Sequence, residues 1–131
     1  MSKATVPSVS PPPTADRAPL RLQVRVELGD GHRIGPGKMD LLEAIGQTGS
    51  ITAAGRRLGM SYRRAWLLVS ALNRMFDAPV VETVAGGAHG GGAKLTELGT
   101  ELVAAYRALE KVTCDMAHER LARFQGRLAR P

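Results

Sequence analysis

The sequence predicts a mainly α-helical fold with a small β component (α+β). Three features support this class: two short amphipathic segments that meet at a glycine, two strand-like segments around a glycine-rich stretch, and a long C-terminal segment with apolar residues every three or four positions. Helices repeat their apolar residues with a period of 3.6 and strands with a period of 2. The length of 131 residues suits one domain.

The chain begins with a tail that is expected not to join the core. Residues 1–19 hold five of the eight prolines, a composition typical of a disordered segment. Residues 20–28 then alternate apolar and polar side chains, which predicts a half-buried strand. A glycine-rich turn at 29–31 leads to a short return strand at 32–34.

Two helices are expected next. Pro36 fits the first turn of a helix whose apolar face ends where glycines appear, in residues 46–49. Ser50 is a suitable N-cap for a second, short helix that Gly59 ends. The expected inner residues of the two helices are Met39, Leu42, Ile45, Ile51, Ala54 and Leu58.

A third helix is expected over residues 62–76, with Ser61 as its N-cap. Its expected core stripe is Ala65, Leu68, Val69, Leu72 and Phe76. Its expected outward residues are Tyr62, Arg63, Ser70, Asn73 and Arg74. Two short helices joined by a tight glycine-containing turn match the helix-turn-helix plan of DNA-binding proteins.

A hairpin and a long helix complete the chain. Residues 80–84 and 93–95 predict two strands joined by a flexible glycine-rich connection at 86–92, a shape called a wing. Thr96 begins a helix that runs to about residue 125. Its apolar residues have the a/d spacing of a coiled-coil seam, with a shift before the last: Leu98, Leu102, Ala105, Leu109, Val112, Met116 and Leu121.

The expected organisation is therefore a disordered Pro-rich tail (1–19), a winged helix-turn-helix DNA-binding domain (20–95) and a dimerisation helix (96–128). A formal net charge of +6 favours a polyanionic partner. No acidic residue lies between Glu43 and Asp77, whereas five arginines do, and a merely solvated helix face would normally include carboxylates. This charge pattern favours binding to double-stranded DNA.

Helix-turn-helix docking inserts the start of the third helix into the major groove, which would bring Tyr62, Arg63 and Trp66 to base edges. Phosphate contacts would come from both helices and the wing. Trp66 could equally seal the helix pair. The full set of expected DNA contacts is Ser50, Thr52, Arg56, Arg57, Ser61, Tyr62, Arg63, Arg64, Trp66, Arg74, His89, Gly90, Gly91 and Lys94.

A resemblance to a known family is carried by two runs, GSITAAGRRLGMSYRRAWLLVSALNRMF and GGAHGGGAKLTELGTELVAAYR. They resemble the N-terminal DNA-binding domain of the molybdate-responsive ModE regulators, which is itself similar to LysR-type winged helices. The resemblance covers residue 20 to about residue 127. It implies a homodimeric transcriptional regulator with paired terminal helices and a link to molybdenum metabolism. Full-length members carry a C-terminal molybdate-binding region, which this chain is expected to lack because it stops at Pro131.

Other functions have weaker support. Cys114 and His118 share a helix face and could serve a metal- or redox-responsive regulator, but two ligands are too few for a metal site. A winged-helix module that binds an acidic protein is the other alternative. Neither an enzyme motif nor a nucleotide cradle is present, so no catalysis and no cofactor are expected. The single cysteine and the lack of a signal peptide or apolar span predict a cytoplasmic protein without membrane contact.

Overall fold

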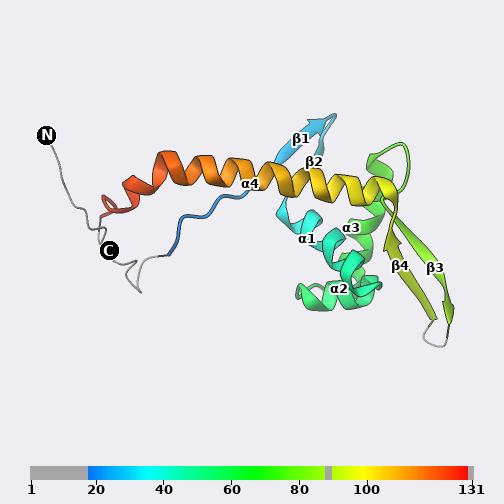
Figure 1. Cartoon of the computed structure of the whole chain (residues 1–131). Coiled ribbons are helices and arrows are strands. Elements are labelled where there is room, and N and C mark those ends of the chain that lie inside the picture. Colours follow the sequence, from blue (N-terminus) through cyan, green and yellow to red (C-terminus); the bar gives the residue numbers. More distant parts are fainter. Residues whose placement is uncertain (1–17, 88–89, 130–131) are drawn as a thin grey trace, which may run out of the picture.

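The computed structural model of the chain describes residues 18–87 and 90–129 (Figure 1). Its elements follow in the order β1 (Val26–Gly29), β2 (His32–Ile34), α1 (Pro36–Thr48), α2 (Ile51–Arg57), α3 (Tyr62–Met75), β3 (Val81–Gly87), β4 (Gly90–Leu95) and α4 (Glu97–Gln125). Each antiparallel pair, β1 with β2 and β3 with β4, forms a two-stranded sheet. Figure 1 shows the β3–β4 hairpin projecting from the helical body, while α4 crosses the body and extends well beyond it. The predicted fold class is confirmed.

The hydrophobic core surrounds α1. Met39, Leu42 and Ile45 are fully buried, as their spacing predicts, and Leu41 is buried with them. The other elements contribute Ile34, Ile51, Ala54, Ala65, Val69, Leu72, Val80, Val81, Ala93, Val103 and Tyr106. Side chains from α1, α3, the wing and the first half of α4 therefore share one core.

The end of α1 lies within the predicted range of residues 46–49. The helix continues through Gly46 to Thr48, and its C-cap is Gly49 in the left-handed conformation with φ +74°. A Cβ on Gly46 would lie 3.2 Å from Cδ1 of Leu95. Gly46 therefore permits close packing of α1 on β4 and does not end the helix. The sequence alone does not distinguish a glycine that is needed for close packing from a glycine that ends a helix.

The strand expected at 20–28 is mostly absent. Only residues from Val26 onward form a ladder, because the return strand β2 is three residues long and offers no partner to residues 20–25. In Figure 1 this segment runs extended beside α4. Its backbone is held there by side chains of α4, since the Tyr106 hydroxyl donates to the Val24 carbonyl at 2.7 Å.

Asn73 was expected to face outward, and the structure places it at a junction between α3 and the wing. Its Oδ1 accepts from the backbone N–H groups of Val80 and Val81 at 2.8 and 3.0 Å, and its Nδ2 donates to the Val81 carbonyl at 2.9 Å. These three bonds fix the start of β3 on α3. Its polar character gave no sign of this role, because the partners are backbone groups of another element.

Asn73→Ala is expected to lower the free energy of unfolding by about 2–4 kcal/mol, because it leaves part-buried backbone groups of β3 unpaired. Urea unfolding followed by circular dichroism measures the change. The matched control is Arg74→Ala, at the exposed neighbouring position of the same helix turn. Equal changes in the two variants would show that the Asn73 bonds do not stabilise the fold.

Arg107 joins α4 to α1 through a cluster of ion pairs. Its Nη2 lies 2.7 Å from Asp40 Oδ1 and 3.0 Å from Glu43 Oε1, and its Nη1 lies 2.8 Å from Glu110 Oε1. Burial of the guanidinium opposes its charge, but the hydrogen bonds that it donates to Asp40, Glu110 and Glu43 outweigh this effect and raise the pKa of Arg107 above its ordinary value. The cluster sets the direction in which α4 leaves the body.

The last helix ends where the sequence predicts, at about residue 125, within the expected dimerisation segment 96–128. α4 ends at Gln125, and the chain then turns, with Leu128 N–H donating to the Gln125 carbonyl at 3.3 Å. The helix of 29 residues is about 44 Å long at 1.5 Å per residue. Within the described ranges, no helix combines the length and apolar character needed to cross a membrane.

Candidate nucleic-acid interface

The crossing of α2 and α3 depends on two glycines. Gly59 adopts φ +72°, which permits the tight turn that the sequence predicts. Gly55 is buried, and a Cβ placed on it would lie 3.0 Å from Cβ of Ala65 in α3. The Met60 N–H also donates to the Gly55 carbonyl at 2.8 Å, which closes the turn. The role of Gly55 was not predicted, because the sequence of α2 alone does not show that α3 approaches it closely.

Both predicted serine caps are confirmed. Ser50 Oγ accepts from the Ala53 N–H at 3.0 Å, and Ser61 Oγ accepts from the Arg64 N–H at 3.1 Å. These bonds fix where α2 and α3 begin. Each hydroxyl proton stays available to a further acceptor. Leu58, expected on the inner face of α2, is instead its C-cap and is 36% exposed.

The first turn of α3 presents Tyr62, Arg63 and Arg64 to solvent, and Tyr62 is 58% exposed. The guanidinium groups of Arg63 and Arg64 form no hydrogen bond or ion pair with any described residue, so their donors are available to a ligand. Arg74 is exposed but lies about 16 Å farther along the helix axis at 1.5 Å per residue. The fold therefore gathers the first-turn residues and leaves Arg74 apart from them.

The last turn of α2 carries Arg56 and Arg57, both exposed. Arg57 Nη1 donates to Gln47 Oε1 at 2.6 Å, which ties this arginine to the end of α1. No carboxylate interrupts the sequence of α2 and α3. The surface of the two helices is consequently positive, as their composition predicts.

The wing is anchored directly to the helix-turn-helix. Ala93 N–H donates to the Gly49 carbonyl at 2.9 Å, and a Cβ on Gly92 would come within 3.0 Å of the same oxygen. Lys94 Nζ lies 3.5 Å from Glu82 Oε1 across the hairpin, so an acidic side chain accompanies the expected phosphate contact. Both groups are largely exposed, and their pairing is weak.

The expected glycine connection of the wing was drawn too long. All five of its glycines lie in the strands, where Gly87 pairs with Gly90, and the register shifts between Val84 and Gly87. Gly90 and Gly91 are thus part of β4. His89, another expected contact, lies outside the described residues.

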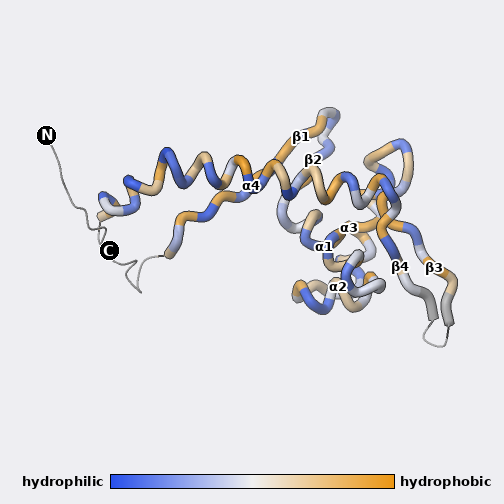
Figure 2. Tube along the Cα trace, in the orientation of Figure 1, coloured by the Kyte–Doolittle hydropathy of each residue, from blue (hydrophilic) through white to orange (hydrophobic). Residues whose placement is uncertain are grey.

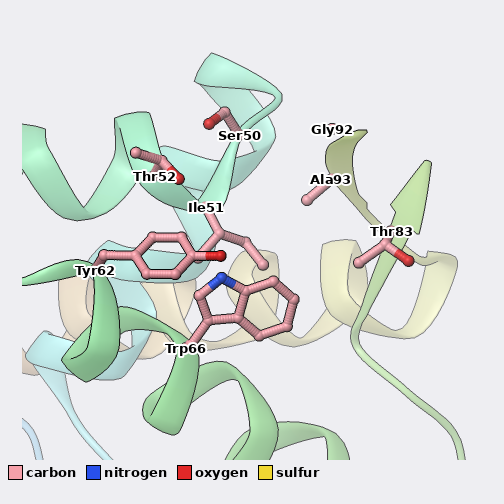
Figure 3. A pocket seen from close by; sticks show the side chains of 8 residues that line it. All are labelled: Ser50, Ile51, Thr52, Tyr62, Trp66, Thr83, Gly92 and Ala93. Carbon is pink, nitrogen blue, oxygen red and sulfur yellow. The ribbon is translucent and has the colours of Figure 1, made fainter. Parts of the chain in front are cut away.

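A pocket of about 200 Å³ opens between the helix-turn-helix and the wing (Figure 3). It is lined by Ser50, Ile51, Thr52, Tyr62, Trp66, Thr83, Gly92 and Ala93. Tyr62 and Trp66 meet edge to face, with ring centroids 6.1 Å apart and an interplanar angle of 66°. The indole ring of Trp66 is half-buried and packs against the core, and its Nε1 is buried without a hydrogen-bond partner.

The apolar residues of α4 divide into two stripes. Gly99, Val103 and Tyr106 are buried against the body of their own chain. The expected seam residues lie on another face, where Leu98 and Leu102 still pack partly on the core and Ala105 is exposed. Beyond the body the exposed seam residues are Leu109 (41%), Val112 (60%), Met116 (49%) and Leu121 (52%). Figure 2 shows apolar and polar residues alternating along this projecting half of α4.

The alternative of a metal site gains no further ligands from the fold. Cys114 is half-buried and His118 is exposed on α4. In the two described ranges, no group of three or more His, Cys, Asp or Glu side chains is arranged to hold a metal ion. Cys114 and His118 therefore gain no third ligand among the described residues.

Residues 37–100 match the family described as bacterial regulatory helix-turn-helix protein, lysR family. The match runs from the first turn of α1, through the helix-turn-helix and the wing, to the first turn of α4. Among solved structures, the chain is similar to the CbnR_DBD–DNA complex, with a TM-score of 0.50 and 24% sequence identity, over 66% of this chain and 94% of that chain. This similarity supports the fold.

Curated relatives match more than half of the chain. The chain is 52% identical over 80 residues to the molybdenum-pterin-binding protein MopB of Rhodobacter capsulatus, an alignment that covers 61% of this chain and 30% of that protein. It is 37% identical over 116 residues to the molybdenum transport protein ModE of Azotobacter vinelandii, covering 86% and 42%. With the DNA-binding transcriptional dual regulator ModE of Escherichia coli (strain K12) it shares 35% identity over 77 residues, covering 59% and 29%. The chain thus spans less than half the length of these relatives.

Proposed function

Residues 37–100 form a domain of the lysR family of bacterial regulatory helix-turn-helix proteins, and from this membership we propose that the chain is a transcriptional regulator that binds specific double-stranded DNA as a homodimer. The observation that carries the proposal is the exposed first turn of α3, where the side chains of Arg63 and Arg64 have no partner among the described residues. Ser61 caps this turn and directs it outward. An arginine so placed can bond bidentately to guanine in the major groove.

The roles of the contacts follow from their positions. Arg63 at the start of the recognition helix would read bases, together with Tyr62. Side chains on α2 and the wing would hold phosphates and set the register without reading sequence. The proposed phosphate contacts are Ser50, Thr52, Arg56, Arg57, Arg64, Gly90, Gly91 and Lys94. Arg74 lies too far along α3 to share their surface and would meet a phosphate elsewhere.

Arg63→Ala is expected to relax base preference at one position of the site, whereas Arg57→Ala should weaken binding to all sequences about equally. Selection of bound sequences from a randomised duplex pool reads the first effect. Titrations at several salt concentrations read the second, with the slope of log affinity against log salt reduced by about 1 for Arg57→Ala. Negligible effects of both substitutions would reject the docking. If the unaltered chain bound duplex DNA without a salt dependence, phosphate contacts would not carry the binding. That result would favour the alternative of a module that binds an acidic protein.

Pairing of the exposed seam on α4 with a second copy is proposed as the dimer contact. A two-fold axis between the paired α4 helices would place two copies of α3 on one face of the DNA. The target would then be an inverted repeat with half-sites about one or two DNA turns apart. Residues 20–95 would read DNA, and the helix within 96–128 would set the spacing.

A role in molybdenum metabolism is proposed from the names of the relatives, which describe molybdenum-pterin-binding and molybdenum transport proteins. The chain would act in the cytoplasm, where the DNA lies, and not as an enzyme. Deleting the coding gene should change transcript levels of molybdate transport or molybdoenzyme genes. Unchanged transcripts at both low and high molybdate would remove this assignment and leave DNA binding intact.

A further inference from the structure

The pocket between the helix-turn-helix and the wing is a fixed feature of the fold. One wall is the start of α2, where Ser50 is held by its capping bond. The opposite wall is β4, which the bond from Ala93 N–H to the Gly49 carbonyl fixes at 2.9 Å. The floor is α3, with Tyr62 and Trp66 (Figure 3). The backbone bond between Ala93 and Gly49 therefore holds β4 beside the start of α2.

The indole N–H of Trp66 is an unsatisfied donor in this pocket. Its Nε1 is buried and has no hydrogen-bond partner among the described residues. Figure 3 shows this nitrogen on the edge of the ring that faces Ile51 and Tyr62. Buried polar groups in native proteins nearly always have a partner, and an unpaired one destabilises the fold. A ligand that supplies an acceptor would remove this cost.

Tyr62 covers the donor without being fixed in place. Its ring meets the indole edge to face at 6.1 Å, yet the residue is 58% exposed. The Tyr62 hydroxyl forms no hydrogen bond with a described residue. A rotation of this exposed side chain can therefore uncover the indole N–H when a partner arrives at the surface of α3.

The chemistry of the lining selects for an acceptor. The polar groups are the hydroxyls of Ser50, Thr52 and Thr83 and the two ring side chains, and no lining residue carries a carboxylate. An indole N–H donates only, and the Oγ of Ser50 already accepts one bond, which leaves its proton to donate. Phosphate oxygens only accept, whereas base edges in the grooves present donors as well.

We propose that this pocket takes one phosphodiester group of the DNA backbone, with Trp66 Nε1 as a donor to it. The inference rests on the proposed DNA-binding function and adds a specific contact whose donor, the indole N–H, is uncharged. Trp66 then has two roles, since one side of its ring packs on the core while its N–H edge meets DNA. The contact positions the recognition helix and does not read sequence.

The test replaces Trp66 with benzothienylalanine, which keeps the bicyclic ring and exchanges the N–H for sulfur. Affinity for short duplex DNA of randomised sequence should fall about tenfold, the size expected for one hydrogen bond to a charged acceptor. The thermal unfolding temperature should be unchanged or higher, because no internal bond is lost. The unaltered chain, whose only tryptophan is Trp66, should change its fluorescence on adding duplex DNA but not on adding inorganic phosphate.

Several results would overturn the proposal. Equal affinities of the two proteins would show that the indole N–H does not meet DNA, and a lower unfolding temperature would show that it has an internal partner. A fluorescence response to inorganic phosphate alone would make the pocket a site for free anions. The unaltered chain could bind duplex DNA with a steep salt dependence while the replacement of Trp66 leaves the affinity unchanged. In that case the proposed function stands and the Trp66 contact fails. If the unaltered chain binds no duplex DNA, both fail.

Discussion

Replacing Leu109 with aspartate is expected to convert the proposed dimer into a monomer. Leu109 is 41% exposed in the single chain, at an a/d position of the α4 seam. In the dimer this position would be enclosed by the facing helix, where an unpaired carboxylate is strongly disfavoured. Light scattering measures the change in mass. Affinity for a DNA with two half-sites should fall by about 100-fold or more, since each monomer then binds alone.

The matched control is Ala104→Asp, which introduces the same charge at an exposed position of α4 off the seam. It should leave the dimer intact. A Leu109→Asp protein that stays dimeric would move the interface to another surface. If both variants became monomeric, the cause would be net charge or loss of helix and not the seam.

The second large effect is expected from Gly99→Ala. Gly99 lies in the first turn of α4, where the new Cβ would overlap the backbone carbonyl oxygen of Val80. That carbonyl cannot move freely, because it accepts from the Thr96 N–H at 3.0 Å. The free energy of unfolding should drop by about 3 kcal/mol or more, the cost of forcing backbone apart in a packed core. Urea unfolding measures it.

Gly37→Ala provides the control for this substitution. Gly37 also lies in the first turn of a helix, α1, but a Cβ there would have no neighbour within 4 Å. Alanine should raise stability by about 0.4–1 kcal/mol, since it restricts the unfolded chain and favours the helix. A loss of similar size in both variants would mean that backbone freedom, and not the contact with Val80, explains the effect.

These two predictions concern two different faces of one helix. The face with Gly99, Val103 and Tyr106 builds the core of the single chain. The seam with Leu109 and Val112 is left to solvent. Gly99→Ala should therefore lower the stability of the body and leave the apolar residues of the seam unchanged. Leu109→Asp should separate the copies and leave the fold of each intact. The contrast separates stability from assembly.

Local signals in the sequence predicted much of the fold and part of the site. The serine caps, the turn glycine at residue 59 and the apolar period of α3 each depend on neighbours a few residues away, and all are confirmed. The arginines of α2 and α3 were expected on the surface because a charged side chain is rarely buried without a partner. Arg56, Arg57, Arg63, Arg64 and Arg74 are all exposed.

The sequence alone determined which residues make each helix cap, where the helix-turn-helix turns and which surface is positive, because these properties depend on nearby residues. Only the tertiary structure decided the roles of Asn73, Gly55 and Gly99, whose partners lie in other elements. It also showed that Trp66 packs on the core while its N–H has no described partner. The a/d spacing of the seam on α4 was predicted from the sequence. The buried stripe beside it was not, because its burial depends on how α4 packs against the body. Contacts between distant segments depend on how the elements are arranged in space, and no local pattern records that arrangement.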